Sequence, residues 1–208
     1  MKKLILSFAL MMSMMSFAQS FEGEIFYKNT VKSKVLEIEA EKWLEMLGSE
    51  QHFYIKRDHY KSETNGKVAQ WQLYDAKSNK IYTKPGNSEV LLWNDAAINN
   101  DVVIKSEVKA HAAKILGYDC DEIKMTCKSG IQTFYVSAKL AVDYKLYEKH
   151  AYGNWSVFLK QANGLSLKTI IETPQFIMEQ EAVEIQPRPI DEAFFKLPAN
   201  AKSTKNPY

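Results

Sequence analysis

Turn signals divide the chain into short segments in which apolar and polar residues alternate, or in which β-branched and aromatic residues gather. Phe21 to Tyr27 alternates in this way, and two strand-like runs, His52 to Thr64 and Val68 to Asp75, flank Asn65-Gly66. Asn-Gly is the strongest short hairpin signal, because both residues tolerate positive φ. Aromatic residues make up 12% of the chain, and many stand beside Val and Ile in such runs. The pattern therefore predicts an antiparallel sheet.

The same alternation of runs and turns continues toward the C-terminus. Turns are predicted at Pro85-Gly86-Asn87, Asn99-Asn100-Asp101, Ser129-Gly130 and Thr173-Pro174. The strand-like runs between them are Val90 to Trp93, Val102 to Val108, Lys114 to Cys127, Ile131 to Ser137, Leu165 to Glu172 and Phe176 to Ile185. The polar tail from Ala199 to Tyr208 is expected to be loose.

Two stretches have helical periodicity instead. In the first, one face is formed by Leu36, Ala40, Trp43, Leu44 and Leu47, and Gly48 is placed to end the helix. In the second, Asn154 is placed to cap a helix, Asn163-Gly164 to stop it, and the shared face is formed by Trp155, Phe158, Leu159 and Ala162. Since the chain has no internal repeat and no linker, we expect one β-rich α+β domain with helices packed on a long sheet.

The first residues have the order of properties of a secretory signal. Met1-Lys2-Lys3 is positive, the apolar run from Leu4 to Met12 is too short to span a bilayer, and Ser16-Phe17-Ala18 fits a small-residue cleavage site. We expect residues 1–18 to be a signal peptide cut between Ala18 and Gln19. Residues 19–208 would then be a single exported domain, periplasmic or secreted. It would be free of N-terminal lipid, since no Cys follows the cleavage point, and without a membrane span.

The positive charge of the chain belongs to the signal. Loss of Lys2 and Lys3 lowers Lys+Arg from 27 to 25, against 25 Asp+Glu, in the 190 residues that remain of 208. Binding to a phosphate backbone requires clustered Lys and Arg. We therefore expect no nucleic-acid partner.

The residues that usually perform catalysis or bind metals are not arranged in a known motif. None of the histidines, His52, His59, His111 and His150, has a partner at metal-ligand spacing on a helix. The chain also lacks a nucleophile elbow, a P-loop and a dinucleotide-binding fingerprint. The sequence therefore predicts a protein that is not an enzyme, with no catalytic residues, no metal and no cofactor.

Two short clusters have a structural explanation that we prefer. Asp119, Asp121 and Glu122 could hold a cation, but they lack the spacing of a calcium loop and fit a solvated strand edge. Asn154-Trp155-Ser156 matches the N-glycosylation acceptor, yet Asn154 is better explained as a helix cap.

Cys120 and Cys127 raise the question of a disulfide, since an exported protein meets an oxidising compartment. If both lie on one straight strand, about 23 Å separates them, whereas a disulfide needs Cα atoms within about 7 Å. We therefore predict that they are not bonded to each other, unless the chain turns between them. Cys127 shares parity with Ile123 and Met125 and should face the core.

The order of several motifs resembles a family. Phe21-Glu22-Gly23-Glu24-Ile25 opens the mature part, Gly117-Tyr118-Asp119-Cys120 stands in a middle strand, Phe134-Tyr135-Val136-Ser137 follows, and Phe194-Phe195-Lys196-Leu197-Pro198 stands near the end. This order resembles an uncharacterised family of exported bacterial domains with a G-Y-x-C strand and an F-x-L-P ending. That family is similar in turn to the periplasmic lipoprotein-carrier (LolA-like) proteins. The resemblance implies a strongly curved antiparallel sheet, an incomplete barrel, covered by two or three helices over an apolar cavity, and it brings no catalytic residues.

Three functions remain open. The first is a carrier for an apolar ligand such as a lipid or acyl chain, in a cavity whose candidate lining is Trp43, Leu47, Trp71, Trp93, Met125, Phe134, Trp155, Phe158 and Leu159. The second is an interaction module that docks on another envelope protein, in which the tryptophans fill an ordinary core. The third is a hydrolase with an unrecognised site, for which the sequence offers no cluster. A carrier requires an apolar cavity of at least about 300 Å³.

Overall fold

The computed structural model describes residues 20–207. The predicted signal peptide of residues 1–18 and its cleavage site at Ala18 and Gln19 lie outside the described residues. No helix in the described part of the chain is long and apolar enough to cross a membrane.

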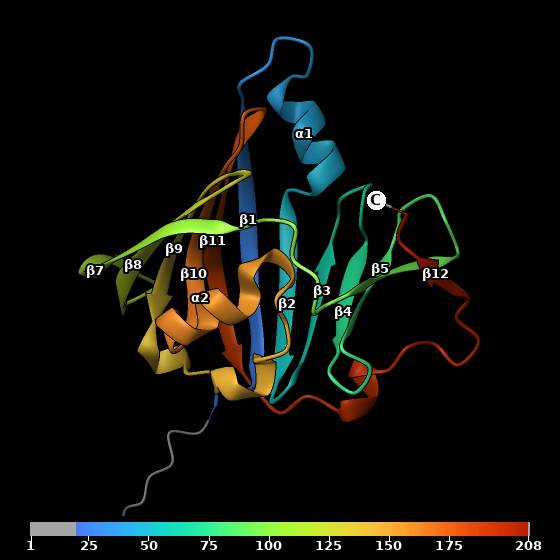
Figure 1. The fold of residues 1–208 in the computed structure, drawn as a ribbon. Coiled ribbons are helices and arrows are strands. Elements are labelled where there is room, and N and C mark those ends of the chain that lie inside the picture. The colour runs from blue at the N-terminus through green and yellow to red at the C-terminus, as the bar shows by residue number, and fades with distance from the viewer. Residues whose placement is uncertain (1–19, 208) are drawn as a thin grey trace, which may run out of the picture.

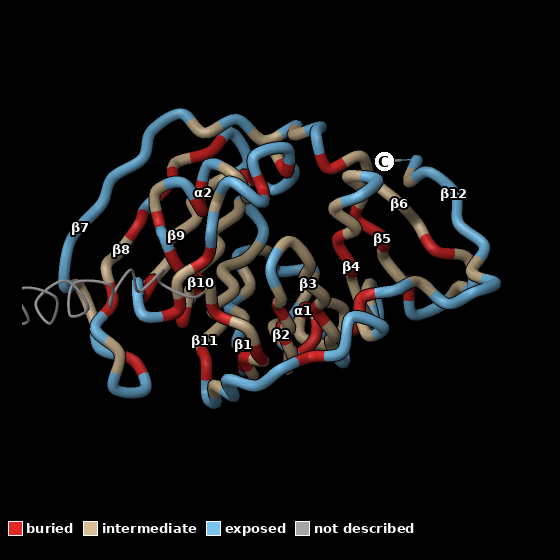
Figure 2. Tube along the Cα trace, turned by 90° about the horizontal axis from the view of Figure 1, so that it is seen from below, coloured by how far each residue is buried: buried red, intermediate tan, exposed pale blue. Residues whose placement is uncertain are grey.

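Strands of the described residues form a 12-stranded sheet in the order β12-β6-β5-β4-β3-β2-β1-β11-β10-β9-β8-β7. Neighbours are antiparallel, except for β12 beside β6. The sheet bends into an open arc whose two edges, β7 and β12, do not meet (Figure 2). This confirms the predicted fold class. The strands are β1 (Gly23–Ser33), β2 (Glu50–Lys56), β3 (His59–Thr64), β4 (Trp71–Asp75), β5 (Lys80–Lys84), β6 (Leu91–Asp95), β7 (Val103–Ile115), β8 (Tyr118–Cys127), β9 (Gly130–Ser137), β10 (Leu165–Glu172), β11 (Phe176–Pro187) and β12 (Ser203–Lys205).

Two α-helices, α1 (Ala40–Leu47) and α2 (Trp155–Ala162), pack at opposite ends of the strands (Figure 1). The Trp43 ring of α1 lies 4.7 Å from that of Phe176 on β11, and the Phe158 ring of α2 lies 4.3 Å from that of Phe134 on β9. Strand register places Phe176 and Phe134 on the same, concave face. Both helices therefore cover the inside of the arc, as their apolar faces require. Short 3-10 helices are η1 (Ala138–Leu140), η2 (Tyr144–Tyr147), η3 (Tyr152–Asn154) and η4 (Glu192–Phe195).

Each face of the sheet has its own hydrophobic cluster. The large one lies between the concave face, α2 and the 3-10 segments, and it includes Ile25, Phe158 and Leu167. The small one lies on the convex face, where Ile190 and Phe195 pack on Leu73 of β4. The F-x-L-P ending therefore has a structural role, because its apolar side chains pack the C-terminal segment against the convex face of the sheet.

The predicted Asn65-Gly66 hairpin is wrong in its details. The run His52 to Thr64 is broken at Arg57, which has a φ of 52°, so that β2 and β3 form a hairpin with each other. β3 and β4 are joined by a longer loop, and Gly66 does not have positive φ. A Cβ on Gly66 would instead lie 2.6 Å from the carbonyl carbon of Leu47. Glycine is needed here because the loop touches the end of α1.

Three other boundaries differ from the prediction. The run Lys114 to Cys127 is divided at Leu116-Gly117, both of positive φ, where β7 turns into β8. The first helix begins at Ala40, and Leu36 is exposed. The tail predicted to be loose contributes β12, which pairs with β6 through Ser203 to Lys205.

Candidate functional site

The concave face carries no charged residue on the described strands from β6 through β1 to β9. Ile25, Phe53 and Tyr60 lie on the concave face. Because residues directly opposite each other on neighbouring strands share a face, the strand register assigns the remaining residues to it. Its polar positions are neutral amides and hydroxyls, and they include Asn29, Ser33, Gln51, Ser62, Thr64, Gln72, Thr83, Asn94, Gln132, Ser166, Thr169 and Gln180. Any ligand that meets this surface meets hydrogen-bonding groups without net charge.

The convex face of the same strands carries the ionic groups. Lys168 Nζ, for example, lies 2.6 Å from Glu179 and 2.9 Å from Glu181. Burial tends to raise the pKa of Glu24, but hydrogen bonds from His52 and Arg188 outweigh it and hold this pKa below its usual value. The two faces of one sheet therefore differ sharply in electrostatic character.

A hollow of about 100 Å³ opens on the concave face beside α2. One wall is aromatic, with Trp155 and Phe158 of α2 facing Phe53 and Phe134 of the sheet, and the rest of the lining is Tyr27, Gln51, Leu165, Ser166, Thr169 and Gln180. Gln180 Nε2 donates to both Asn29 Oδ1 and Gln51 Oε1, each at 3.1 Å. The hollow is amphipathic, and its polar side is fixed by these hydrogen bonds.

A second hollow, of about 170 Å³, lies next to the C-terminal end of α1. Gln51 lines both hollows, so they adjoin on the sheet between the two helices. The remaining side chains of this second hollow include Leu47, Ser62, Thr64 and Gln72. We call the two hollows together the Gln51 trough.

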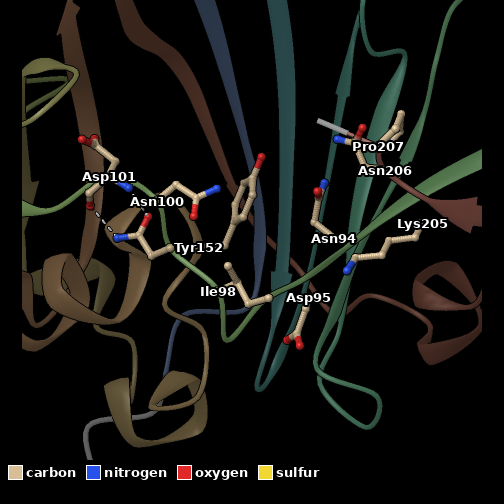
Figure 3. Close-up of a pocket in the computed structure, with 11 residues that line it drawn as sticks. Asn94, Asp95, Ile98, Asn100, Asp101, Tyr152, Lys205, Asn206 and Pro207 are labelled. Atoms are coloured by element: carbon tan, nitrogen blue, oxygen red, sulfur yellow. Dashed lines mark hydrogen bonds between the residues drawn. The ribbon is translucent and has the colours of Figure 1, made fainter.

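A larger hollow of about 490 Å³ lies where the segment between β6 and β7 crosses in front of the concave face (Figure 1). Tyr152 projects into it between Asn100 on one side and Asn94 of β6 on the other (Figure 3). Its Asp101 already accepts hydrogen bonds from the backbone N–H and hydroxyl of Ser129, so this carboxylate holds the loop in place. Asparagine amides, the Tyr152 phenol and the charged groups of Asp95 and Lys205 line this hollow.

Asn154 supports this loop and does not cap α2, which corrects the prediction. Its φ is 64°, and its side chain makes no capping hydrogen bond. Asn154 Oδ1 accepts from Asn99 Nδ2 at 2.6 Å, and the residue is only 1% exposed. An acceptor for glycosylation must be reachable at the surface, so this burial also argues against the N-x-S reading.

His150 is the histidine with the most perturbed environment, and it belongs to the core. Its Nε2 lies 2.7 Å from the Tyr60 hydroxyl, and its ring stacks among Tyr60, Tyr74 and Trp155. Burial lowers the pKa of His150 to about 4. The ring lines none of the hollows described above, so it stabilises the packing of β3 and β4 against the segment before α2.

Both cysteines are free and buried in β8, as the reach argument predicts. Burial raises the pKa of each thiol, and Cys127 lies in the core with Ile123 and Met125 as expected from parity. Within residues 20–207, no group of His, Cys, Asp and Glu is placed to hold a metal ion.

The structure divides the nine predicted lining residues among several places. Phe134, Trp155 and Phe158 meet at the hollow beside α2, and Leu47 lines the hollow beside α1. Met125 and Leu159 are fully buried in the core. Trp43 is buried against Phe176 and lines neither hollow.

Trp71 and Trp93, both candidates for the cavity lining, lie on the convex face. Trp71 borders the hollow beside α1, but its ring packs in the convex cluster, where Lys61 Nζ lies 5.6 Å from the ring centroid. Lys80 Nζ lies 3.8 Å from the Trp93 centroid on the same face. A single large apolar cavity shared by both helices is therefore absent from the described residues. The apolar hollow beside α2, of about 100 Å³, is smaller than a carrier would require.

The sequence reasoning missed the polar half of the trough. Gln51, Thr169 and Gln180 stand in strand-like runs without a motif, and the predicted lining consisted of apolar and aromatic residues instead. The sequence nevertheless contains a pattern that indicates one uncharged face. Alternate positions in these runs are uncharged, while the positions between them include Lys and Glu.

No family model and no curated protein matches the chain. Among solved structures, PNGF-II matches with a TM-score of 0.50 and 16% identity over 90% of this chain and 32% of that one. This chain thus spans about a third of PNGF-II, and the likeness shows the fold. LolA superfamily protein NE2245 from Nitrosomonas europaea matches with a TM-score of 0.39 and 5% identity, over 86% of this chain and 91% of that one.

Proposed function

We propose that this protein is a non-catalytic binding protein whose concave face takes up a neutral, hydroxyl-rich ligand such as a stretch of oligosaccharide. The observation behind the proposal is the uncharged, amide-lined and hydroxyl-lined concave face with aromatic side chains at its margin. Ligand sites combine apolar contact area with a few fixed polar groups that set orientation. Sugar rings offer both, because their hydroxyls pair with amides and their C–H faces lie on aromatic rings.

The geometry of the polar groups suits such a ligand. Gln180 Nε2 donates to both Gln51 Oε1 and Asn29 Oδ1, so a ligand would meet side chains that are already ordered. Preorganised groups bind more tightly, because less conformational entropy is lost on binding. The hollow of about 490 Å³ beside Tyr152 is large enough for a small ligand and also presents amides.

The absence of catalysis is part of the proposal. His150, whose pKa is lowered to about 4 by burial, is used in packing and lines none of the hollows described above. We further propose that binding takes place after export, in the periplasm or outside the cell, because Met1 to Ala18 has the properties of a signal peptide.

The test is calorimetric titration with a panel of neutral oligosaccharides, built from glucose, mannose or N-acetylglucosamine. At least one should bind, and Gln51→Ala should weaken that binding about tenfold through the lost hydrogen bonds. Glu50→Ala is the matched control, because Glu50 is the next residue on β2 and faces the other side. Equal loss in both variants, or no binding by any sugar, would contradict the proposal.

An acyl chain is the second candidate, and the aromatic wall of Phe134, Trp155 and Phe158 favours it. A hollow of about 100 Å³ admits only the end of such a chain, each buried methylene contributing about 0.8 kcal/mol. A fluorescent fatty acid would bind in this case, and Phe134→Asn would weaken it while Tyr135→Asn, on the opposite face of β9, would not. Binding of the fatty acid without any sugar would favour this candidate.

A further inference from the structure

The two edges of the sheet differ in length and exposure. β12 has only three residues, whereas β7 runs from Val103 to Ile115 with β8 as its single neighbour. Every residue from Ile104 to Ala110 is exposed, and Figure 2 shows this edge as a long exposed stretch. An edge strand presents unpaired backbone N–H and C=O groups that can pair with another strand.

The side chains of β7 have unusual composition for an exposed edge. Ile104 is 71% exposed and Val108 is 59% exposed. On the convex side, Lys105 and Glu107 form an ion pair of 2.9 Å, so the edge has no net charge at this point. Beyond Lys109 the strand leaves its register with β8, and His111 has a φ of 52°. A second register shift lies between Val103 and Lys105, so the regular, exposed part of the edge is residues 105–109.

We propose that this edge pairs with the same edge of a second copy of the chain, antiparallel and centred on Ser106, to form a symmetric dimer. In this register Lys105 lies opposite the partner copy's Glu107, and Glu107 opposite its Lys105. Opposite charges directly across two antiparallel strands are a favourable cross-strand combination.

The charge pattern selects this register over its neighbours. The two-fold axis must pass through a residue of β7, because an axis between two residues would place the two faces of the strand opposite each other. The alternative registers therefore have their centre on a neighbouring residue. A centre at Glu107 would oppose Lys105 to Lys109 and Glu107 to itself. A centre at Lys105 would oppose that lysine to itself. A centre at Val108 would pair Glu107 with Lys109, but it would place Lys105 opposite His111, where the backbone φ of 52° interrupts the strand. A two-fold axis makes each favourable pair occur twice.

The test uses charge reversal on the full chain and measures molecular mass by sedimentation equilibrium across concentration. The native protein should dimerise. Glu107→Lys and Lys105→Glu should each weaken dimerisation at least tenfold, because like charges then face each other. An equimolar mixture of these two variants should dimerise again, and so should the double swap Lys105→Glu/Glu107→Lys. Reversal of Glu184, a charge on β11 far from this edge in the sheet order, is the control and should have no effect.

A crosslink tests the register itself. Ser106→Cys places a thiol opposite its own copy and should give an intermolecular disulfide under mild oxidation, while Lys109→Cys should not. The native cysteines do not compete, since both are buried. A monomer at all concentrations, or a dimer that is insensitive to both charge reversals, would overturn the proposal. Edge pairing with a different protein, by a chain that stays monomeric alone, would also overturn it.

Discussion

The concave and convex faces belong to the same strands, yet they are stabilised in different ways. The concave face joins α2 and the 3-10 segments in one apolar cluster and leaves a neutral polar trough beside it. The convex face carries ion pairs and a thin apolar cover from the C-terminal segment. A face that is covered by helices must exclude charge, because an unpaired buried charge is costly. A face in contact with water has no such restriction.

The largest effect should come from the concave core. Phe158 is 2% exposed and packs on Phe134 and Trp155. Phe158→Ala should lower the free energy of unfolding by about 3–5 kcal/mol, because it leaves a cavity in a packed site. Chemical denaturation measures this. Phe195→Ala, in the small convex cluster, should lower the free energy of unfolding by less. A larger loss for Phe195→Ala than for Phe158→Ala would contradict the difference drawn between the two faces. Polar substitution at Phe158 would unfold the protein and cannot serve as a binding test.

The second effect is a pH dependence located on the concave side. The pKa of His150 is about 4 in the folded protein, below its ordinary value of 6.5, because the ring is buried. The unfolded chain therefore binds more protons between these values, and stability is complete above pH 6.5 and falls as pH drops toward 4. The loss should reach about 3 kcal/mol. Urea denaturation at several pH values measures it, and His150→Phe should remove most of the slope in this range.

The convex carboxylate Glu24 should respond in a different range. Its pKa is held below its usual value by His52 and Arg188 although burial opposes this, so its contribution is complete above the unfolded pKa and is lost as pH falls through the folded one. Glu24→Gln should therefore lower stability by a constant amount at neutral pH, and its difference from the native protein should shrink only below about pH 4.5. A difference that already changes between pH 5 and 7 would contradict this assignment.

A direct comparison of the faces is possible on one strand. Gln180→Glu places a carboxylate beside Gln51 and Asn29 in the neutral network, and it should cost about 1–3 kcal/mol. Glu181→Gln, on the next residue and the opposite face, removes only a partly exposed contact with Lys168 and should stay within about 0.5 kcal/mol. Thermal unfolding of the two variants at neutral pH measures the difference. Similar values would show that the trough tolerates charge.

The smallest effect should come from the convex cation–aromatic contacts. Lys61 Nζ lies 4.4 Å from the Phe194 ring centroid and 5.6 Å from that of Trp71. Lys61→Met keeps the aliphatic contact and removes the charge, so it should cost no more than about 1 kcal/mol. High salt should reduce the difference between native protein and variant if the contact is electrostatic.

Much of the fold was predictable because its signals are local. Gly48 and Asn163-Gly164 end the two helices as expected, and the last strand pair turns at Thr173-Pro174. Parity correctly placed Cys127 with Ile123 and Met125 in the core. These results depend on backbone preferences and on side-chain alternation within one strand, so they need no knowledge of distant segments.

The candidate site was predictable only in part. The apolar wall was found, since Phe134, Trp155 and Phe158 do meet at one hollow. Trp71 and Trp93 were assigned to the same site, although they lie on the convex face. A strand's alternation separates its two faces without stating which face a helix will cover, and that choice depends on register across many strands.

The sequence by itself determined the β-rich class, the C-terminal ends of both helices and the alternation of neutral and charged positions. Only the tertiary structure decided which alternating set faces inward, that Gln51 joins two hollows, and that Gly66 is required by the approach of α1 rather than by its φ. The physical reason is distance along the chain. Gln180 is 129 residues from Gln51 and 151 from Asn29, and their hydrogen bonds exist only after β1, β2 and β11 have paired in one register.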